Sequence, residues 1–472
     1  AGDVGPAWGV HAAFAAALAG LLVARTSVLG MVSPAAFTHF IDNPIAHLAF
    51  PQSTATALLV AARYARLLVE PFPLSLDYSY DAIAPADSLV APGALAGAGL
   101  AAVVLGGAVF LWRRRPAAAF GFGFMAIAFA PVSNLLVPIG TIMAERLLYL
   151  PSVGFALIGA CVAAAAATLP GLLGRAARVG IAAALLGGAF LSGLRLRDFH
   201  DDLTIQAKTV ATTPRSVRAQ FNYGAAAETA GDDATAERAY REAIALWPDF
   251  ADAQFNLAGL LARRGRLDEA LAHYREALRE QPGSVTYLVN YGAALTRAGR
   301  PAEAIEPLER AVGIDPGSDR AWNNLGGARL ALGRADEAAQ AWRAAIRIAP
   351  GEAEYAVNLA LALDAAGDPG AAAAWSDAVA RRPGDGLLLY RLGRAHERAG
   401  REAEAIAAYR ESARVAPASP VPRRALGLLL DRRGDAAGAR AALEEAERLD
   451  QGGGVFDAEA RRVLDRLRAA AR

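Results

Sequence analysis

Proline and glycine recur at a fixed spacing throughout the second half of this chain. Prolines fall at 248, 282, 316, 350, 383 and 417, and the steps between them are 34, 34, 34, 33 and 34. Glycines at 231, 265, 299, 333, 367, 400 and 434 follow the same period and lose one residue in the same unit. Glycine commonly ends a helix and proline commonly follows one. The spacing therefore predicts stacked pairs of helices, which excludes most globular folds for this half.

The residues between these markers identify the repeat class. Small residues recur where the two helices of a unit meet, at Gly224, Ala258, Gly292, Gly326, Ala360, Gly393 and Gly427. Pairs such as Tyr240 with Ala243, and Trp342 with Ala345, recur in the second helix. A 34-residue period with this pattern is typical of the tetratricopeptide repeat. We predict seven repeats over residues 216–450 and an amphipathic capping helix over 455–472, because such arrays need capped ends.

A row of asparagines occupies one position on the first helix of the repeats. It recurs once in each of five successive units, at Asn222, Asn256, Asn290, Asn324 and Asn358. A side-chain amide can donate to and accept from a peptide backbone at once. The row, here called the asparagine ladder, therefore predicts binding of an acceptor polypeptide in the repeat groove. The alternative is that asparagine is simply common at this helix position. Arg391 and Ala425 take its place in the last two repeats.

The first 200 residues carry most of the apolar weight of the 472-residue chain, which is 54% hydrophobic. About 20 apolar residues suffice to cross about 30 Å of hydrocarbon. We predict spans at about residues 7–31, 93–112, 116–132, 152–169 and 179–194. The predicted fold is therefore all-α, a polytopic transmembrane helix bundle at 1–200 followed by a tetratricopeptide-repeat α-solenoid.

Arginine clusters orient the predicted spans. Arg113–Arg115 and the Arg175/Arg178 pair lie in predicted short loops, which places both in the cytoplasm. The loops at 32–92 and 132–150 and all of the repeats are then extracytoplasmic. Residues 52–69 have a helical pattern, and we interpret them as a re-entrant or interfacial helix, since a span there would reverse this orientation. The Ala-, Gly- and Arg-rich composition indicates a bacterium, hence its inner (plasma) membrane.

Several polar residues stand out in the apolar half. Glu145 and Arg146 separate two uncharged runs, a costly arrangement that predicts a functional site or, alternatively, an interfacial ion pair. Arg63 and Arg66 share a helix face and either bind a lipid phosphate or extend to the headgroups. Asp77 and Tyr78 suit sugar recognition or an aromatic belt.

Other site classes are not expected. The isolated histidines predict no metal site, a single cysteine gives no disulfide framework, and a net charge of +1 predicts no nucleic-acid partner.

Three stretches and the repeats together resemble a known family. They are DNP at 42–44, RYARLLVEPFPLSLDYS at 63–79, and PVSNLLVPIGTIMAERLLYLPSVGF at 131–155. The chain resembles the transmembrane and tetratricopeptide repeat-containing protein O-mannosyltransferases, which have a GT-C membrane fold. The resemblance implies inverting transfer of a sugar, mannose, from a polyprenyl-phosphate donor to Ser or Thr of a protein, without a cofactor.

The resemblance also implies roles for these residues. Glu145 and Asp77 would be the catalytic carboxylates. The lipid-linked sugar would be bound by Arg146, Arg63, Arg66, Tyr78, Tyr149 and Asn134. The asparagine ladder would hold the acceptor, and membrane lipids would surround the spans.

One departure from the family pattern is clear. GT-C enzymes carry an essential acidic pair in their first extracytoplasmic loop, whereas residues 1–31 contain only Asp3. We therefore expect this chain to be the C-terminal part of such an enzyme, without its main catalytic aspartate. Two alternatives are an O-antigen-ligase-like transferase acting on lipid, and a membrane-anchored repeat scaffold for envelope protein assembly.

Overall fold

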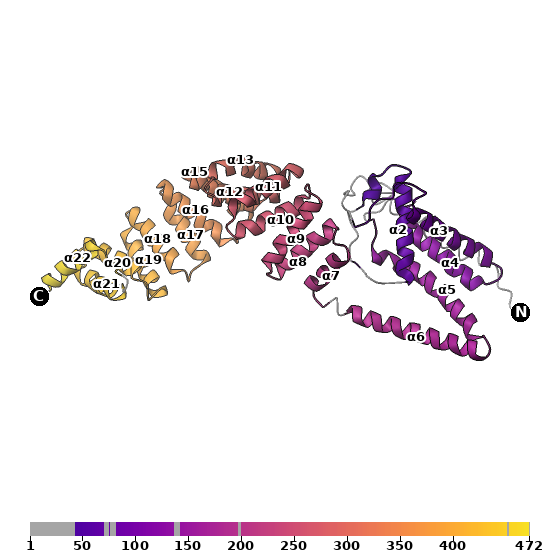
Figure 1. The fold of residues 1–472 in the computed structure, drawn as a ribbon. Helices are drawn as coiled ribbons and strands as arrows, with labels where there is room; N and C mark the ends of the chain where they lie inside the picture. The colour runs from indigo at the N-terminus through magenta and orange to yellow at the C-terminus, as the bar shows by residue number, and fades with distance from the viewer. Residues whose placement is uncertain are drawn as a thin grey trace. The chain divides into compact units, whose positions relative to one another are not determined.

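The computed structural model describes residues 43–69, 75, 82–135, 142–196, 200–450 and 453–471. Every regular element in these ranges is a helix, which confirms the predicted all-α class (Figure 1). The chain divides into two compact units, Ala1–Leu257 and Ala258–Arg472, which are described separately. The first predicted span, at 7–31, lies outside the described residues.

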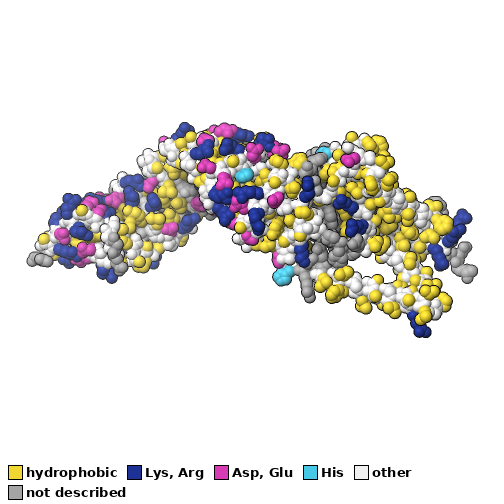
Figure 2. Space-filling model, in the orientation of Figure 1, with side chains coloured by type: hydrophobic (Ala, Val, Ile, Leu, Met, Phe, Trp, Pro, Cys, Tyr) yellow, Lys and Arg dark blue, Asp and Glu magenta, His cyan; other side chains and the backbone are white. Residues whose placement is uncertain are grey.

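The first unit contains the apolar helices. Its elements are η2 (Pro44–His47), α2 (Gln52–Val69), α3 (Pro92–Leu111), α4 (Pro116–Phe129), η3 (Ala130–Val132), η4 (Glu145–Leu148), α5 (Tyr149–Ala167) and α6 (Gly171–Leu196). Among the described residues, α3, α5 and the first 21 residues of α6 are long and apolar enough to cross a membrane. Large apolar side chains are exposed along α6, and many apolar side chains lie on the face of this helix seen in Figure 2.

Glycines let α4 and α5 approach closely. A Cβ on Gly154 would lie 2.5 Å from the carbonyl oxygen of Gly121. Small residues at such contacts are typical of helix pairs in membranes, where close van der Waals packing replaces the hydrophobic effect. The helices α2, α3, α4 and α5 pack successively on one another.

The last apolar helix begins earlier than predicted from the sequence. The prediction placed Arg175 and Arg178 in a loop before a span at 179–194, but both lie inside α6. Gly171 has a φ of +63°, which lets the chain turn directly after α5 and restart a helix. Arg178 then donates from Nη1 to the carbonyl oxygen of Ala167, at 2.9 Å, at the end of α5.

The repeats follow as alternating first and second helices. The first unit holds α7 (Asp202–Thr212), α8 (Val217–Thr229) and α9 (Asp233–Leu246), and α10 (Ala251–Arg263) contains the boundary. The second unit continues with α11 (Leu267–Glu280), α12 (Val285–Arg297), α13 (Pro301–Ile314), α14 (Asp319–Ala331), α15 (Ala335–Ile348), α16 (Ala353–Ala366), α17 (Ala371–Arg381), α18 (Gly386–Arg398), α19 (Glu402–Val415), α20 (Val421–Arg432), α21 (Ala436–Leu449) and α22 (Ala458–Ala470).

The periodic glycines lie at the turn between the first and second helix of each repeat. All seven have a left-handed backbone, with φ between +70° and +81°, and this conformation favours glycine over any residue with a Cβ. The small residues on the first helices make room for large side chains. A Cβ on Gly326 would lie 2.8 Å from the Trp342 ring, and one on Gly393 would lie 2.5 Å from the Tyr409 ring.

A helix that was not predicted from the sequence precedes the first repeat. α7 packs on α8, and Pro214, just after α7, lies one full period before Pro248. Thr209 on α7 is buried and lies one full period before Ala243, the alanine that packs in α9. α7 is therefore the second helix of a half repeat.

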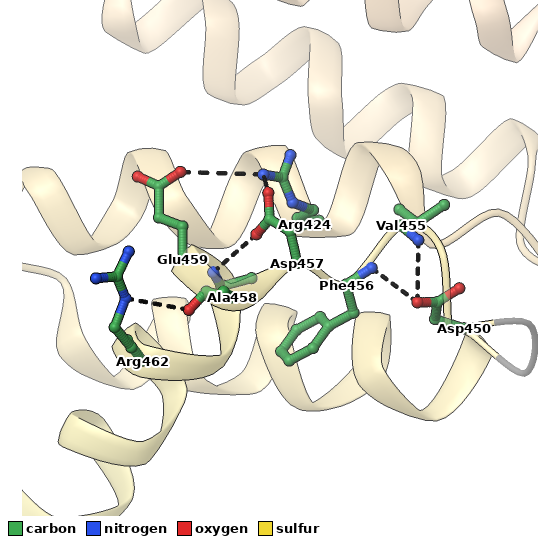
Figure 3. A network of polar contacts seen from close by, with 9 residues as sticks. Arg424, Asp450, Val455, Phe456, Asp457, Ala458, Glu459 and Arg462 are labelled. Carbon is green, nitrogen blue, oxygen red and sulfur yellow. Dashed lines mark hydrogen bonds and ion pairs between the residues drawn. The ribbon is translucent and has the colours of Figure 1, made fainter.

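The other end of the array has the converse arrangement. α22 packs on α20 and α21, as the first helix of a further repeat would. Asp450 accepts from the backbone N–H groups of Val455 and Phe456, at 3.1 and 2.7 Å (Figure 3). Asp457 caps α22 by accepting from Ala460 N at 3.0 Å. It also pairs with Arg424 on α20 (Figure 3).

Candidate functional site

Two buried asparagines join segments that are far apart in the sequence of the first unit. The amide nitrogen of Asn43 donates to Oδ1 of Asn134 at 2.9 Å. Asn134 donates from Nδ2 to the carbonyl oxygen of Ile142 at 3.1 Å, and it has a left-handed backbone with φ +57°. Asn43 also accepts from Ile45 N at 3.1 Å, which caps η2. Both amides are thus used to hold residues 43–45, 134 and 142 together.

Tyr64 on α2 binds the backbone of Ala144, two residues after Ile142. Its hydroxyl accepts from Ala144 N at 2.8 Å and donates to the Ala144 carbonyl oxygen at 3.2 Å. The ring is 1% exposed and packs edge-on against Phe129, with centroids 5.4 Å apart. Glu145 follows directly, so these contacts fix the backbone at the start of η4.

The structure brings only some of the predicted site residues together. Glu145 and Arg146 begin η4, but their side chains lie outside the description. Arg63 and Arg66 are exposed on α2, on either side of Tyr64 in the sequence. Because α2 contacts η4, these two arginines and Arg146 lie on neighbouring elements. Tyr149, at the start of α5, is 78% exposed.

Two further predicted residues, Asp77 and Tyr78, lie outside the described residues. Asn134 is 5% exposed, with its amide engaged as above. The roles of Asn43 and Tyr64 were not predicted from the sequence, although both residues belong to the quoted stretches.

An apolar cavity of about 690 Å³ lies beside this network, between α2, α3, α4 and α5. Small residues such as Ala101 and Ala126 line it together with larger apolar side chains. Two lining residues carry hydroxyls: Tyr64, already bonded to Ala144, and Ser133, which donates to the Ala130 carbonyl oxygen at 2.8 Å. A cavity with such a lining fits a hydrocarbon chain and not a sugar.

The asparagine ladder makes contacts inside the array. Asn256 donates to the Tyr240 hydroxyl at 3.4 Å, and Asn290 donates to the Thr286 carbonyl oxygen at 2.8 Å. Asn324 donates to the Val289 carbonyl oxygen at 3.4 Å, in the preceding first helix. Asn358 donates to Oδ1 of Asn323 at 3.2 Å, and Asn222 is half-buried on α8. Each amide has two N–H groups and a carbonyl, so one internal bond does not exhaust it.

Burial raises the pKa of tyrosines on the second helices that pack against the first helices. The pKa of Tyr274 rises to about 12, chiefly through burial of the ring. The pKa of Tyr409 is raised by burial and by its hydrogen bond to Glu397 at 2.6 Å. These hydroxyls are therefore donors at neutral pH.

Among the described residues, no group of three or more His, Cys, Asp and Glu is arranged to hold a metal ion.

Comparison with known proteins shows two kinds of similarity. Models of the tetratricopeptide repeat match residues 204–249, 226–285, 295–363 and 357–420. The first match begins in α7, in agreement with the half repeat described above. A tetratricopeptide repeat protein from Parabacteroides merdae, solved by crystallography, is 17% identical with a TM-score of 0.39, over 54% of this chain and 99% of its own.

The chain is also similar to curated proteins named protein O-mannosyl-transferase. Protein O-mannosyl-transferase TMTC4 of Homo sapiens is 30% identical over 241 residues, 47% of this chain and 30% of that protein. Protein O-mannosyl-transferase Tmtc2 of Drosophila melanogaster is 33% identical over 129 residues, 27% of this chain and 13% of that protein. The chain thus spans less than a third of the length of these relatives.

Proposed function

We propose that this chain acts in a membrane glycosyltransferase that moves a sugar, mannose, from a polyprenyl-phosphate donor to Ser or Thr of a bound protein. The observation that carries the proposal is the apolar cavity beside the network that fixes the start of η4. Its support is the similarity to proteins named protein O-mannosyl-transferase.

The cavity provides a place for the lipid part of the donor. Leu148 of η4 and Ser133 both line it, so a chain bound there ends beside the segment that carries Glu145 and Arg146. An isoprenoid needs no hydrogen-bond partners, which matches a lining whose hydroxyls are satisfied internally. The phosphate would then lie near η4 and the arginines of α2.

The chemistry assigns the predicted residues to three tasks. The acceptor hydroxyl attacks the anomeric carbon while a carboxylate, Glu145 or Asp77, takes its proton. The bond between that carbon and the phosphate oxygen breaks, and its electron pair leaves with polyprenyl phosphate, which inverts the carbon. Arg146, helped by Arg63 and Arg66, stabilises the leaving phosphate. Tyr78 and Tyr149 contact the sugar, whereas Asn134, which was expected to bind it, holds the segment before η4 through its buried amide.

The repeats present the acceptor through the asparagine ladder. Transfer requires acceptor and donor on the same side of the membrane. If Arg113–Arg115 lie in the cytoplasm, as the positive-inside rule predicts, η4 and the repeats would both lie on the extracytoplasmic side of a bacterial plasma membrane.

The first test is transfer in proteoliposomes that contain the complete glycosyltransferase in which we propose that this chain acts. The donor is polyprenyl-phosphate [14C]mannose, and the acceptor is a Ser/Thr-rich polypeptide added on the repeat side. Arg146→Ala should reduce transfer about 100-fold or more, the usual effect of removing one group that stabilises a developing charge. Arg115→Ala, an exposed arginine in the turn between α3 and α4, is the matched control and should transfer normally. Equal transfer by both variants would refute the assignment of Arg146.

A binding assay tests the lipid part independently of transfer. A photoreactive polyprenyl phosphate should label peptides from α2 to α5, and Ala126→Phe, which fills the cavity, should reduce that labelling. Leu185→Phe, on the exposed surface of α6, is the control that adds a ring outside the cavity. Absence of labelling in the unmodified chain would favour the scaffold alternative.

A further inference from the structure

The position of the asparagine ladder is taken by an arginine in the sixth repeat. Arg391 on α18 follows Asn358 by one repeat, the fifth, which is one residue shorter than the others. Arg394 and Leu387 lie three residues after and four residues before it, so all three share a face of α18. Leu387 is 59% exposed and Arg394 is exposed, so this face is accessible.

Acidic residues at the ends of the neighbouring first helices are already paired. Asp364 binds Arg398 at 2.6 Å, and Asp431 binds Arg466 at 2.5 Å. Glu397 accepts from the Tyr409 hydroxyl and pairs with Arg432. These pairs form a series linking α16, α18, α20 and α22, and each joins equivalent regions of successive first helices.

Arg391 and Arg394 stand outside this series. Within the part of the chain that the structure describes, no Asp or Glu oxygen lies within 4.0 Å of either guanidinium. Arg391 instead lies over the ring of Trp375, 5.6 Å from its centroid, and that ring is fully buried. A guanidinium held on an aromatic face is oriented and keeps its N–H groups for another partner.

From Asn256 onward, the residue three positions after each ladder position changes in size. Three residues after each ladder position lie Gly259, Ala293 and Gly327, followed by Leu361 and Arg394. A Cβ on Gly327 would meet no atom within 4 Å, so space remains beside Asn324. Larger side chains therefore replace this open space from α16 onward, just before the two arginines.

We propose that Arg391 and Arg394 bind an acidic side chain of the polypeptide that lies along the asparagine ladder. The inference rests on the polypeptide-binding part of the proposed function and adds a preference to it. The uncharged ladder contacts the polypeptide backbone and has no preference for particular side chains. The two arginines favour polypeptides that have Asp or Glu at the point where the bound segment lies against the sixth repeat. Carboxylates suit this pair because a guanidinium can bind them through two parallel hydrogen bonds.

The test compares two peptides that differ only in charge. One fluorescent peptide of Gly, Ser and Thr carries three Glu residues near one end, and the other carries three Gln residues there. Binding to the 472-residue chain in detergent is measured by fluorescence anisotropy at low and high salt. The Glu peptide should bind about fivefold tighter at low salt, since exposed ion pairs are individually weak, and the advantage should shrink at high salt.

Two variants locate the effect. Arg391→Gln with Arg394→Gln should make the two peptides bind equally, without changing the affinity for the Gln peptide. Arg410→Gln, an exposed arginine on α19 of the same repeat, should preserve the preference. Equal binding of both peptides by the unmodified chain, or an equal loss in the control, would overturn the proposal. Mannose transfer to the Gln peptide reports separately on the proposed function, because it does not depend on these arginines.

Discussion

Replacing Tyr64 with phenylalanine should release the segment that leads into η4. The variant keeps the ring and its packing on Phe129, so the change is confined to one hydroxyl. That hydroxyl is bonded to both backbone groups of Ala144, at 2.8 Å to N and 3.2 Å to O. The carbonyl oxygen also accepts from Leu147 N at 3.0 Å and stays satisfied, so the N–H of Ala144 is the group left unpaired.

The expected size of the effect follows from that single group. A buried donor without a partner costs about 1–3 kcal/mol, so we expect local opening of residues 142–148 to become easier by about 2 kcal/mol. This corresponds to about a 30-fold larger opening constant, and amide exchange in this segment should accelerate by a similar factor. Exchange in α8, which lies in the first repeat, should not change.

Hydrogen–deuterium exchange with mass spectrometry measures both regions in one experiment. Tyr149→Phe removes a hydroxyl from a residue that is 78% exposed at the end of the same segment, and it should exchange as the unmodified chain does. The reasoning would be refuted if Tyr64→Phe left exchange at 142–148 unchanged. It would also be refuted if the two variants accelerated exchange there equally.

Gly326→Ala should destabilise the repeats by about 1–3 kcal/mol, because its Cβ would overlap the Trp342 ring. The control is Gly327→Ala, whose Cβ would meet nothing within 4 Å and should not destabilise them. Denaturant unfolding compares the free energies of unfolding of the two variants. The pKa of Asp457 lies below its ordinary 3.8 because it caps Ala460 and pairs with Arg424. A lowered pKa contributes stability above the ordinary value, and this contribution is lost as pH falls through the folded value. The protection factors of the α22 amides, which correct for the slower intrinsic exchange at low pH, should therefore fall at acidic pH, and fall less in Asp457→Asn.

The repeat half was predictable because its contacts are local and periodic. Each glycine and proline has the same neighbours in every unit, so spacing alone located the turns, and the amphipathic pattern located α22. The half repeat at α7 was missed, although Pro214 follows the same period. Its packing residue is Thr209 and not alanine, so the residue pattern hides the repeat there.

The candidate site was less predictable because its contacts are distant in sequence. Asn43 and Asn134 are 91 residues apart, and Tyr64 and Ala144 are 80 apart, and no period relates them. The charged residues of these stretches stood out against an apolar background. Nothing in the residue pattern indicated that an uncharged tyrosine and two amides hold the stretches together. The cavity was also missed, because it depends on which small residues face one another across four helices.

Because the array begins and ends with a half repeat, complete repeats can be added or removed between these ends without changing either end. A further repeat inserted after Pro383 would follow the second helix α17 and precede the first helix α18, as every other repeat follows a second helix and precedes a first helix. Gene duplication can therefore lengthen or shorten the groove without any change in the membrane helices. The length of the array can therefore evolve separately from the site beside η4.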